Sequence, residues 1–196
     1  MKTIELTDLE LVNEFIGGNE GAIEVLVRRY KNKVYTYIYL TVRNQHLAED
    51  LFQDTFVKVI KSLQEGKYQD NGRLLPWIMR IAHNLIIDHY RREKQLNTFS
   101  NDDYEQDLFN SVKFAEDNVE QQMVYSQVLS DVRRLIDQLP PDQKEIILLR
   151  HYGDLSFKEI ADQTNVSINT ALGRMRYALI NMRRLIKEHD ICLSVK

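Results

Sequence analysis

Cysteine, proline and glycine are scarce in this sequence of 196 residues. It contains one cysteine, three prolines and seven glycines. A single cysteine excludes an intrachain disulfide and any cysteine-rich zinc site. So few prolines and glycines leave little material for the turns of an all-β protein. We therefore expect a predominantly helical chain with no metal site.

Long apolar runs are also missing from the sequence. No run approaches the ~20 residues that a membrane-spanning helix needs. The first ten residues, MKTIELTDLE, lack the basic and apolar regions of a secretory signal. We expect a cytoplasmic protein that does not insert into a membrane. The length suits one large domain or two small ones, and we predict two.

The formal net charge of −3 is distributed unevenly along the chain. Residues 1–93 hold 13 basic and 13 acidic side chains, residues 94–125 hold 2 and 7, and residues 126–196 hold 11 and 9. From residue 167 to residue 187 there are five cations and no carboxylate. A surface that faces phosphates excludes carboxylates, whereas an ordinary exposed face mixes both signs. The pattern favours a nucleic-acid-binding element near the C-terminus.

Apolar residues recur every three or four positions in the first part of the chain. The pattern predicts four helices, over about residues 7–17, 20–42, 47–64 and 76–92. Together they predict a compact N-terminal helical bundle over residues 1–93. Residues 94–125 lack sustained periodicity and carry the acidic excess, so we predict a linker there. Its scattered aromatic residues leave open whether it docks on a surface or is a solvated spacer.

The stretch SFKEIADQTNVSINTALGRMRYAL begins at Ser156 and has the pattern of two short helices joined by a bend. Ser156 and Glu159 have the spacing of a capping box, and Ser167 is suited to cap the second helix. Ala161 is small enough for two helices to cross closely. The stretch predicts a helix-turn-helix within a C-terminal domain over residues 126–196.

The second helix of this motif carries five candidates for contact with duplex DNA: Ser167, Asn169, Thr170, Arg174 and Arg176. Asparagine and arginine side chains read adenine and guanine edges, while hydroxyls contact bases or phosphates. The N-terminal end of such a helix enters the major groove. A charge run is also a common solvated face, and some helix-turn-helix proteins never bind DNA, so both interpretations stay open.

A second candidate surface lies on the predicted fourth helix. Arg80, Asn84 and Asp88 are spaced by four, and we expect them to lie opposite the apolar stripe that includes Trp77. The preceding loop contains a set of residues able to hold an unstacked base: Tyr68, Asp70, Asn71 and Arg73. Pairing between side chains on an ordinary helix surface explains the ladder equally well.

No catalytic or cofactor-binding motif is visible. His83, Asp88 and His89 fall within seven residues, but their spacing puts them on different helix faces, and we expect surface histidines. The sequence has no phosphate-binding loop, no dinucleotide fingerprint and no G-x-S-x-G motif. We expect a protein that is not an enzyme and that needs no cofactor.

Four segments in series resemble the extracytoplasmic-function sigma factors, the compact bacterial promoter-specificity subunits of RNA polymerase. They are AEDLFQDTF at 48–56, LLPWIMRIAHNLIIDHYRREK at 74–94, LPPDQKEIILLRHYGDLSFKEIA at 139–161 and VSINTALGRMRYAL at 166–179. The resemblance covers nearly the whole chain. It implies an all-α fold with sigma region 2 over residues 1–93, a linker over 94–125 and sigma region 4 over 126–196.

The resemblance also implies roles for individual residues. Asp50, Gln53 and Asp54 match positions that bind the core polymerase, where a charge-complementary patch sets partner choice. Positions at the melted minus-ten element are matched by Asn84, Asp88, Arg91 and Arg92, to which the loop and helix analysis adds Tyr68 and Arg80. Ser167, Thr170 and Arg174 match recognition-helix positions used on the duplex minus-thirty-five element.

The implied function is promoter recognition and initiation of transcription by a sigma factor bound to core RNA polymerase. The implied partners are core RNA polymerase, promoter DNA and an anti-sigma factor. One alternative is a dimeric helix-turn-helix regulator that binds palindromic sites without polymerase. Another is a helical interaction adaptor, for which Arg174→Ala and Arg176→Ala would change nothing in transcription.

Overall fold

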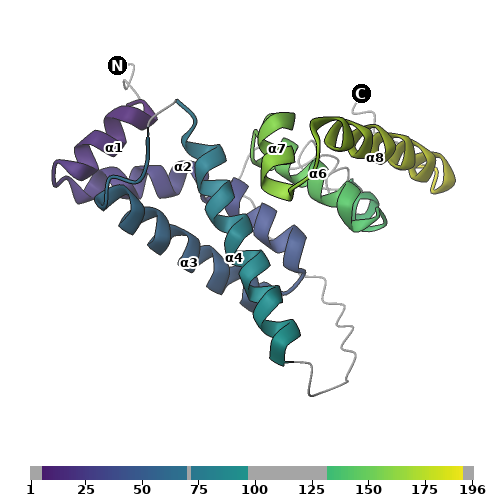
Figure 1. Cartoon of the computed structure of the whole chain (residues 1–196), viewed down its shortest axis with the longest axis horizontal. Coiled ribbons are helices and arrows are strands. Elements are labelled where there is room, and N and C mark those ends of the chain that lie inside the picture. The colour runs from purple at the N-terminus through teal and green to yellow at the C-terminus, as the bar shows by residue number, and fades with distance from the viewer. Residues whose placement is uncertain (1–5, 70–71, 97–131, 192–196) are drawn as a thin grey trace, which may run out of the picture.

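The computed structural model describes residues 6–69, 72–96 and 132–191, and within these ranges every regular element is a helix (Figure 1). The first four helices are α1 (Asp8–Ile16), α2 (Glu20–Val42), α3 (Gln45–Gln64) and α4 (Leu74–Leu96). The last three are α6 (Pro141–Tyr152), α7 (Phe157–Thr164) and α8 (Ile168–Glu188). Residues 132–137 are also helical. The prediction of an all-α chain is confirmed.

The predicted linker only partly falls on described residues. Its first three residues, 94–96, continue α4 as helix, and residues 97–125 lie outside the described part of the chain. The fourth helix is therefore longer at both ends than the predicted range of 76–92. Apolar periodicity locates the middle of a helix better than its ends, which depend on capping and tertiary contacts.

Side-chain caps mark the beginning of five described helices, and Asn19 and Asn44 provide them for α2 and α3. Thr7 and Glu10 form a capping box in front of α1. Ser156 and Glu159 form a second one in front of α7 with the same geometry, since each Glu Oε2 accepts from the cap residue's backbone N–H at 2.7 Å. Ser167 caps α8 by accepting a backbone N–H of its first turn at 3.0 Å. The caps at Ser156 and Ser167 were predicted, because each depends only on residues three positions apart.

The N-terminal helices form the predicted bundle. α2 packs against α1, α3 and α4, and α3 packs against α4. Buried aliphatic side chains from α2, α3 and α4 fill the core between them, among them Leu26, Val34, Ile38, Leu63, Ile78 and Ile86. The core leaves one face of α3 and one face of α4 exposed to solvent, and these faces carry the polar candidate residues.

α7 and α8 form the predicted helix-turn-helix, and α6 packs against both. Asn165 has left-handed backbone (φ 54°), and its N–H donates to the Ala161 carbonyl, which ends α7. Ala161 of α7 is buried, as are Ala171 and Ala178 of α8. Small side chains allow the two helices to approach closely at a steep angle.

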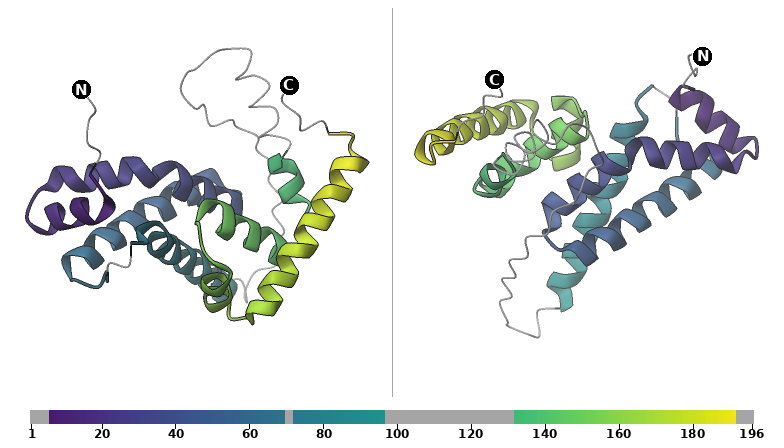
Figure 2. Two further views of the ribbon diagram at one scale, coloured as in Figure 1. Left: turned by 90° about the horizontal axis from the view of Figure 1, so that it is seen from above. Right: turned by 180° about the vertical axis from the view of Figure 1, so that it is seen from behind.

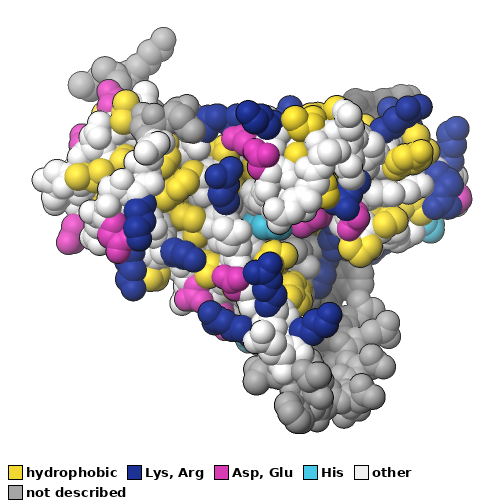
Figure 3. All heavy atoms as spheres, viewed as in Figure 1, with side chains coloured by type: hydrophobic (Ala, Val, Ile, Leu, Met, Phe, Trp, Pro, Cys, Tyr) yellow, Lys and Arg dark blue, Asp and Glu magenta, His cyan; other side chains and the backbone are white. Residues whose placement is uncertain are grey.

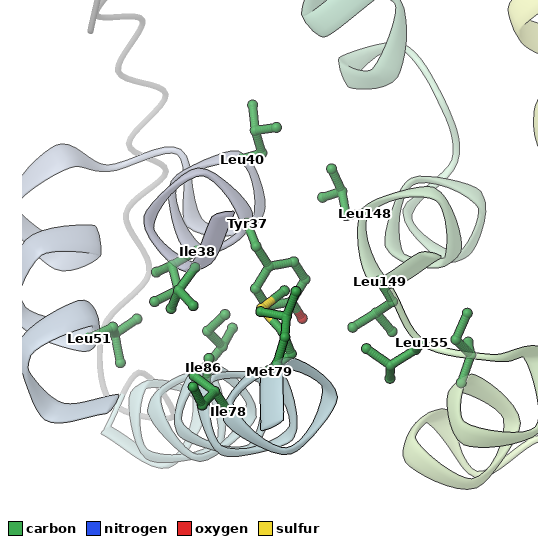
Figure 4. Close-up of a cluster of buried hydrophobic side chains, with 14 of the residues drawn as sticks. Tyr37, Ile38, Leu40, Leu51, Ile78, Met79, Ile86, Leu148, Leu149 and Leu155 are labelled. Carbon is green, nitrogen blue, oxygen red and sulfur yellow. The ribbon is translucent and has the colours of Figure 1, made fainter. Parts of the chain in front are cut away.

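The two groups of helices pack against each other. α6 lies beside α2, and the views of Figures 1 and 2 agree on this arrangement. Figure 4 shows Tyr37 of α2 and Met79 of α4 on one side of the contact, with Leu149 of α6 and the following Leu155 on the other. All four side chains are buried, so one apolar core runs through both groups.

Gly153→Ala is expected to lower the free energy of unfolding by about 1–2 kcal/mol through overpacking. An alanine Cβ there would lie 2.4 Å from Leu155 Cδ1 and 2.7 Å from the Leu149 backbone oxygen, and the latter cannot rotate away. Gly173→Ala in α8 is the matched control. Apart from its chain neighbours and the backbone of its own helix, no heavy atom lies within 4 Å of a Cβ placed at Gly173. The higher helix propensity of alanine should therefore raise the free energy of unfolding by about 0.5–1 kcal/mol. Urea titration followed by circular dichroism measures both, and shifts of the same sign would contradict this account.

Candidate nucleic-acid interface

A pocket opens where the loop before α4 meets the first turns of that helix. It is lined by Tyr68, Gln69, Arg73, Pro76, Trp77, Arg80 and Glu159. The rings of Tyr68 and Trp77 contact each other with centroids 4.9 Å apart and planes at 52°. Two aromatic rings beside two guanidinium groups provide a stacking surface for a base and positive charge for a phosphate.

The seventh residue of this pocket comes from the C-terminal helices. Glu159 of α7 lies 3.0 Å from Arg73 Nη1, and another Arg73 nitrogen donates to the Asp154 carbonyl at 2.8 Å. Partial burial alone raises the pKa of Glu159. Hydrogen bonds from Ser156 and the charges of Arg73 and Arg80 more than offset that effect, so this pKa lies below its usual value. Glu159 is therefore an anion held among cations of the pocket.

The predicted polar ladder continues along α4 beyond the pocket. Arg80 and Asn84 are exposed, and Asp88 is half-buried. Arg91 is largely exposed, with a nitrogen 3.8 Å from an Asp88 oxygen, and Arg92 next to it is exposed. Figure 3 shows Lys and Arg side chains gathered at the lower end of α4. The structure therefore places one long polar face between the pocket and the C-terminal end of the helix.

The prediction that Trp77 lies opposite this ladder is wrong. Trp77 and Arg80 line the same pocket, and Trp77 is only partly buried. Residues three apart on a helix are neighbours on one face, so the apolar stripe borders the polar one. Asp70 and Asn71 of the predicted base-holding loop lie outside the described residues.

His83 is buried, and the prediction of surface histidines is wrong for this residue. Its side chain lies between helices, where Nδ1 is 3.0 Å from the Tyr37 hydroxyl and 3.9 Å from Glu145 Oε1 of α6. Burial lowers the pKa of His83 and raises the pKa of Glu145. Within the described ranges no group of three His, Cys, Asp or Glu side chains could hold a metal ion. His83 therefore joins helices and has no ligand-binding arrangement around it.

His83→Gln is expected to make stability less sensitive to mild acid. Because the folded pKa of His83 lies below its unfolded value of about 6.5, its stabilising contribution is present above that pH and is lost as the pH falls below it. Glu145 acts in the opposite direction, since its raised pKa favours the folded state as the pH falls. Urea titrations between about pH 7 and pH 5.5 should show a smaller loss for the variant than for the wild type. An unchanged or steeper loss would contradict this assignment.

The outer face of α8 presents most of the predicted duplex-reading residues. Ser167, Asn169, Thr170 and Arg176 are exposed, and Figure 3 shows basic side chains over this helix. Five exposed apolar residues share the helix surface, a feature that the sequence analysis did not single out: Ile168, Leu172, Tyr177, Leu179 and Ile180. The face is therefore a mixture of basic, polar and apolar groups.

Arg174 differs from the other candidates on α8. Its Nη2 lies 2.6 Å from Asp142 Oδ2 in the first turn of α6, and its side chain is only 26% exposed. The position of Arg174 on α8 is thus at the edge of the face that packs on α6. Contact with DNA would require the arginine to leave Asp142 or to reach past it.

One face of α3 carries the three residues predicted to bind the polymerase. Asp50, Gln53 and Asp54 are exposed, and Val57 extends the same face with 49% exposure. Thr55 fixes the opposite side, because it is buried and donates its hydroxyl to the Leu51 carbonyl at 2.6 Å. Spacings of three and four bring the two carboxylates, the amide and the valine together on a single surface.

Family comparisons agree with the helical arrangement. A family model described as "Sigma-70 region 2" matches residues 26–95, and one described as "Sigma-70, region 4" matches residues 129–176. The first match contains α3, α4 and the pocket loop. The second contains α6, α7 and the first part of α8.

Comparison with curated proteins gives relatives over most of the chain. The chain is 32% identical over 177 residues to the ECF RNA polymerase sigma factor SigE of Mycolicibacterium smegmatis, covering 88% of this chain and 66% of that protein. It is 30% identical over 183 residues to the RNA polymerase sigma factor CarQ of Myxococcus xanthus, covering 92% and 98%. The chain thus spans about two thirds of the first relative and nearly all of the second.

Solved structures show the same fold. The sigma factor RpoE from Bartonella quintana, crystallised with the anti-sigma factor NepR, aligns with a TM-score of 0.65 and 19% identity, covering 84% of this chain and 96% of that one. CnrH in complex with the cytosolic domain of CnrY aligns with a TM-score of 0.59 and 20% identity, covering 91% and 96%. None of the helices in the described ranges combines the length and the hydropathy that a membrane-spanning segment requires.

Proposed function

Since the chain belongs to the extracytoplasmic-function sigma factors of RNA polymerase, we propose that it binds core RNA polymerase and directs it to promoters. The observation that carries this proposal is sequence similarity to such sigma factors over about nine tenths of the chain. The dimeric regulator and the adaptor considered from the sequence have no comparable support. We propose that the chain acts in the cytoplasm, where it is bound to core polymerase.

We propose that residues 1–93 act as sigma region 2 and residues 126–196 as sigma region 4. The helical groups α1–α4 and α6–α8 support this division. Residues 94–125 would then set how far the two regions can separate. Each region offers only a few side chains able to contact bases, and each good bidentate pair contributes about 1–3 kcal/mol of discrimination.

In this proposal Asp50, Gln53 and Asp54 bind the core polymerase. The exposure of all three on one face of α3 supports the assignment. A fixed pattern of two carboxylates and an amide favours a partner surface with the complementary charge. Docking through α3 would leave the pocket and the polar face of α4 available for DNA.

Melted promoter DNA would bind along the pocket and α4. Tyr68 and Trp77 offer aromatic faces for an unpaired base, and Arg80 lies beside them for a phosphate. Asn84 and Asp88 would contact base edges further along the helix. Arg91 and Arg92 would hold the backbone at the upstream end of the separated strands.

Duplex DNA would bind to α8. Ser167, Asn169 and Thr170 lie at its N-terminal end, which is the part of a recognition helix that enters the major groove. Arg176 is six residues beyond Thr170 and exposed, where it can pair with a phosphate. Arg174 joins these proposed contacts only when it breaks its ion pair with Asp142 and binds DNA instead.

Joining two weak DNA contacts on one polymerase gives the selectivity that neither contact has alone. When both regions are held at a fixed span, binding of the second element becomes an intramolecular step with a high effective concentration. The free chain is therefore expected to bind promoters poorly. The related RpoE was solved with an anti-sigma factor, and we propose an inhibitor of this class for the present chain.

Transcription in vitro with purified core polymerase tests the proposed function. Genomic DNA templates would be transcribed by core enzyme alone and with the added chain, and transcript start sites would be mapped. New and reproducible start sites that require the chain are the expected result. Electrophoretic shift with those promoters should show specific binding only for chain and core together. Tight specific binding by the free chain as a dimer would favour the regulator instead.

A further inference from the structure

Three cations gather around one carboxylate where the C-terminal end of α2 meets the first turn of α6. Asp137 pairs with Arg43, the residue that ends α2, and the same carboxylate oxygen lies 3.0 Å from Lys144 Nζ. Arg133 belongs to the helical residues 132–137, and its charge acts on Arg43. Three positive charges and one negative charge leave this cluster with a net charge of about +2 at neutral pH.

The charges of this cluster are partly withdrawn from water. The Lys144 side chain is only 17% exposed, and the side chains of Arg43 and Asp137 are 34% and 38% exposed. Burial and the charge of Arg43 lower the pKa of Lys144 to about 8, although Asp137 lies beside it. Burial also lowers the pKa of Arg43, and the charge of Arg133 acts in the same direction. One carboxylate is therefore too little counter-charge for the three cations.

We propose that this cluster binds the phosphate group of a small anion, either inorganic phosphate or a nucleoside triphosphate. A phosphate dianion supplies the two negative charges that the cluster lacks. A guanidinium donates to phosphate oxygens bidentately, and an ammonium adds a point charge. Tyr39 holds the Arg43 head in place, since its ring centre lies 6.0 Å from the guanidinium carbon. The partial exposure of Arg43 gives the anion access from solvent.

An internal ion network is the alternative explanation of the cluster, and Asp137 distinguishes the two. In a closed network Asp137 serves only to stabilise the cations, and its removal creates no affinity for an added anion. In a binding site Asp137 competes with the phosphate, because both accept from the same N–H groups. The cluster shares no residue with the pocket before α4 or with α8. The inference therefore does not depend on the proposed function.

Isothermal titration calorimetry of the full chain with sodium phosphate tests the site, with sodium chloride keeping the ionic strength constant. The wild type should bind phosphate, and Lys144→Gln should bind it about tenfold more weakly, because a hydrogen bond between charged groups is lost. Asp137→Asn should bind it about two- to fivefold more tightly, because exposed ion pairs that compete with the anion disappear. A parallel titration with ATP distinguishes the two sources, since tighter binding of ATP than of phosphate identifies a nucleotide as the carrier.

Lys158→Gln is the matched control for Lys144→Gln. Lys158 is an exposed lysine of α7 outside the cluster, so its replacement changes the net charge by the same amount. Its affinity for phosphate should equal that of the wild type. Equal losses in both variants would overturn the inference, because net charge rather than the cluster would then attract the anion. The absence of binding to the wild type at up to about 10 mM phosphate would overturn it too.

The pH dependence of phosphate binding by the wild type protects the test against a folding defect in the variants. Lys144 loses its proton as the pH rises through about 8, whereas arginine side chains stay charged. Phosphate should therefore bind about fivefold more weakly at pH 9 than at pH 7.5. Phosphate should also raise the midpoint of thermal unfolding more for the wild type than for Lys144→Gln. An affinity that stays constant or rises between these two pH values would contradict the assignment of Lys144 as a ligand.

Discussion

Asp54→Lys is expected to weaken binding of the chain to core RNA polymerase by about 100-fold or more, because a like charge placed in a complementary interface costs several kcal/mol. Asp54 lies near the centre of the exposed face that also contains Asp50 and Gln53. The helix should tolerate the change, since the side chain is exposed and lysine is a good helix former. Fluorescence anisotropy of the labelled chain titrated with purified core enzyme gives the affinity.

Glu24→Lys on α2 is the control for Asp54→Lys. Glu24 is also an exposed helical acid, so the change in net charge is the same. It should reduce the affinity only slightly, by a long-range effect that salt screens. If both variants lose the same affinity, the interface is not on α3. The affinity of Asp54→Asn for core polymerase should lie between those of the wild type and Asp54→Lys, since asparagine removes the attraction without adding repulsion.

The helices and their caps could be predicted from the sequence because the determining residues are close together in it. The spacing of Ser156 and Glu159 is enough to predict a capping box, and Pro76 predicts the first turn of a helix. Apolar residues at intervals of three and four give the buried face of α2 in the same way. Each of these patterns depends on local geometry alone, so the fold class followed from them.

Contacts between the two groups of helices could not be predicted in this way. The pairing of Lys33 with Asp154 joins residues 121 positions apart, and nothing in their local sequence distinguishes them from other surface charges. His83 was expected at the surface because a histidine in a helix is not an apolar marker, yet Tyr37 supplies a hydrogen-bonding partner that makes its burial tolerable. Tertiary partners decide such cases.

The candidate site also combines features that the local sequence predicts with features that depend on tertiary contacts. The pattern of exposed residues on α3 and α4 gave Asp54, Arg80 and Asn84 as surface groups, and the structure places them there. The pattern on α8 could not reveal that Arg174 pairs with Asp142, since that depends on where α6 begins. Nor could it reveal that Glu159, predicted as a cap, also enters the pocket.

Asn84→Ala is expected to slow strand opening at a promoter by about 30-fold while leaving the initial closed complex nearly unchanged. Asn84 is exposed on α4 and faces the proposed path of the melted strand, where loss of a good base contact costs about 1–3 kcal/mol. A group that contacts only unpaired bases stabilises the opened complex and not the closed one, so the loss falls on that step. Permanganate footprinting of unpaired thymines measures opening, and gel shift at low temperature measures the closed complex.

Asn169→Ala gives the reciprocal result if the two helices divide the work as proposed. Asn169 is exposed at the start of α8 and would contact paired bases, so its loss should weaken the closed complex by about tenfold. Opening from the complexes that do form should proceed at the wild-type rate. Both variants remove the same amide from an exposed helical position, which makes each the control for the other. Equal losses at both steps for Asn84→Ala would show that its role is structural, because a misfolded α4 would impair docking and opening together.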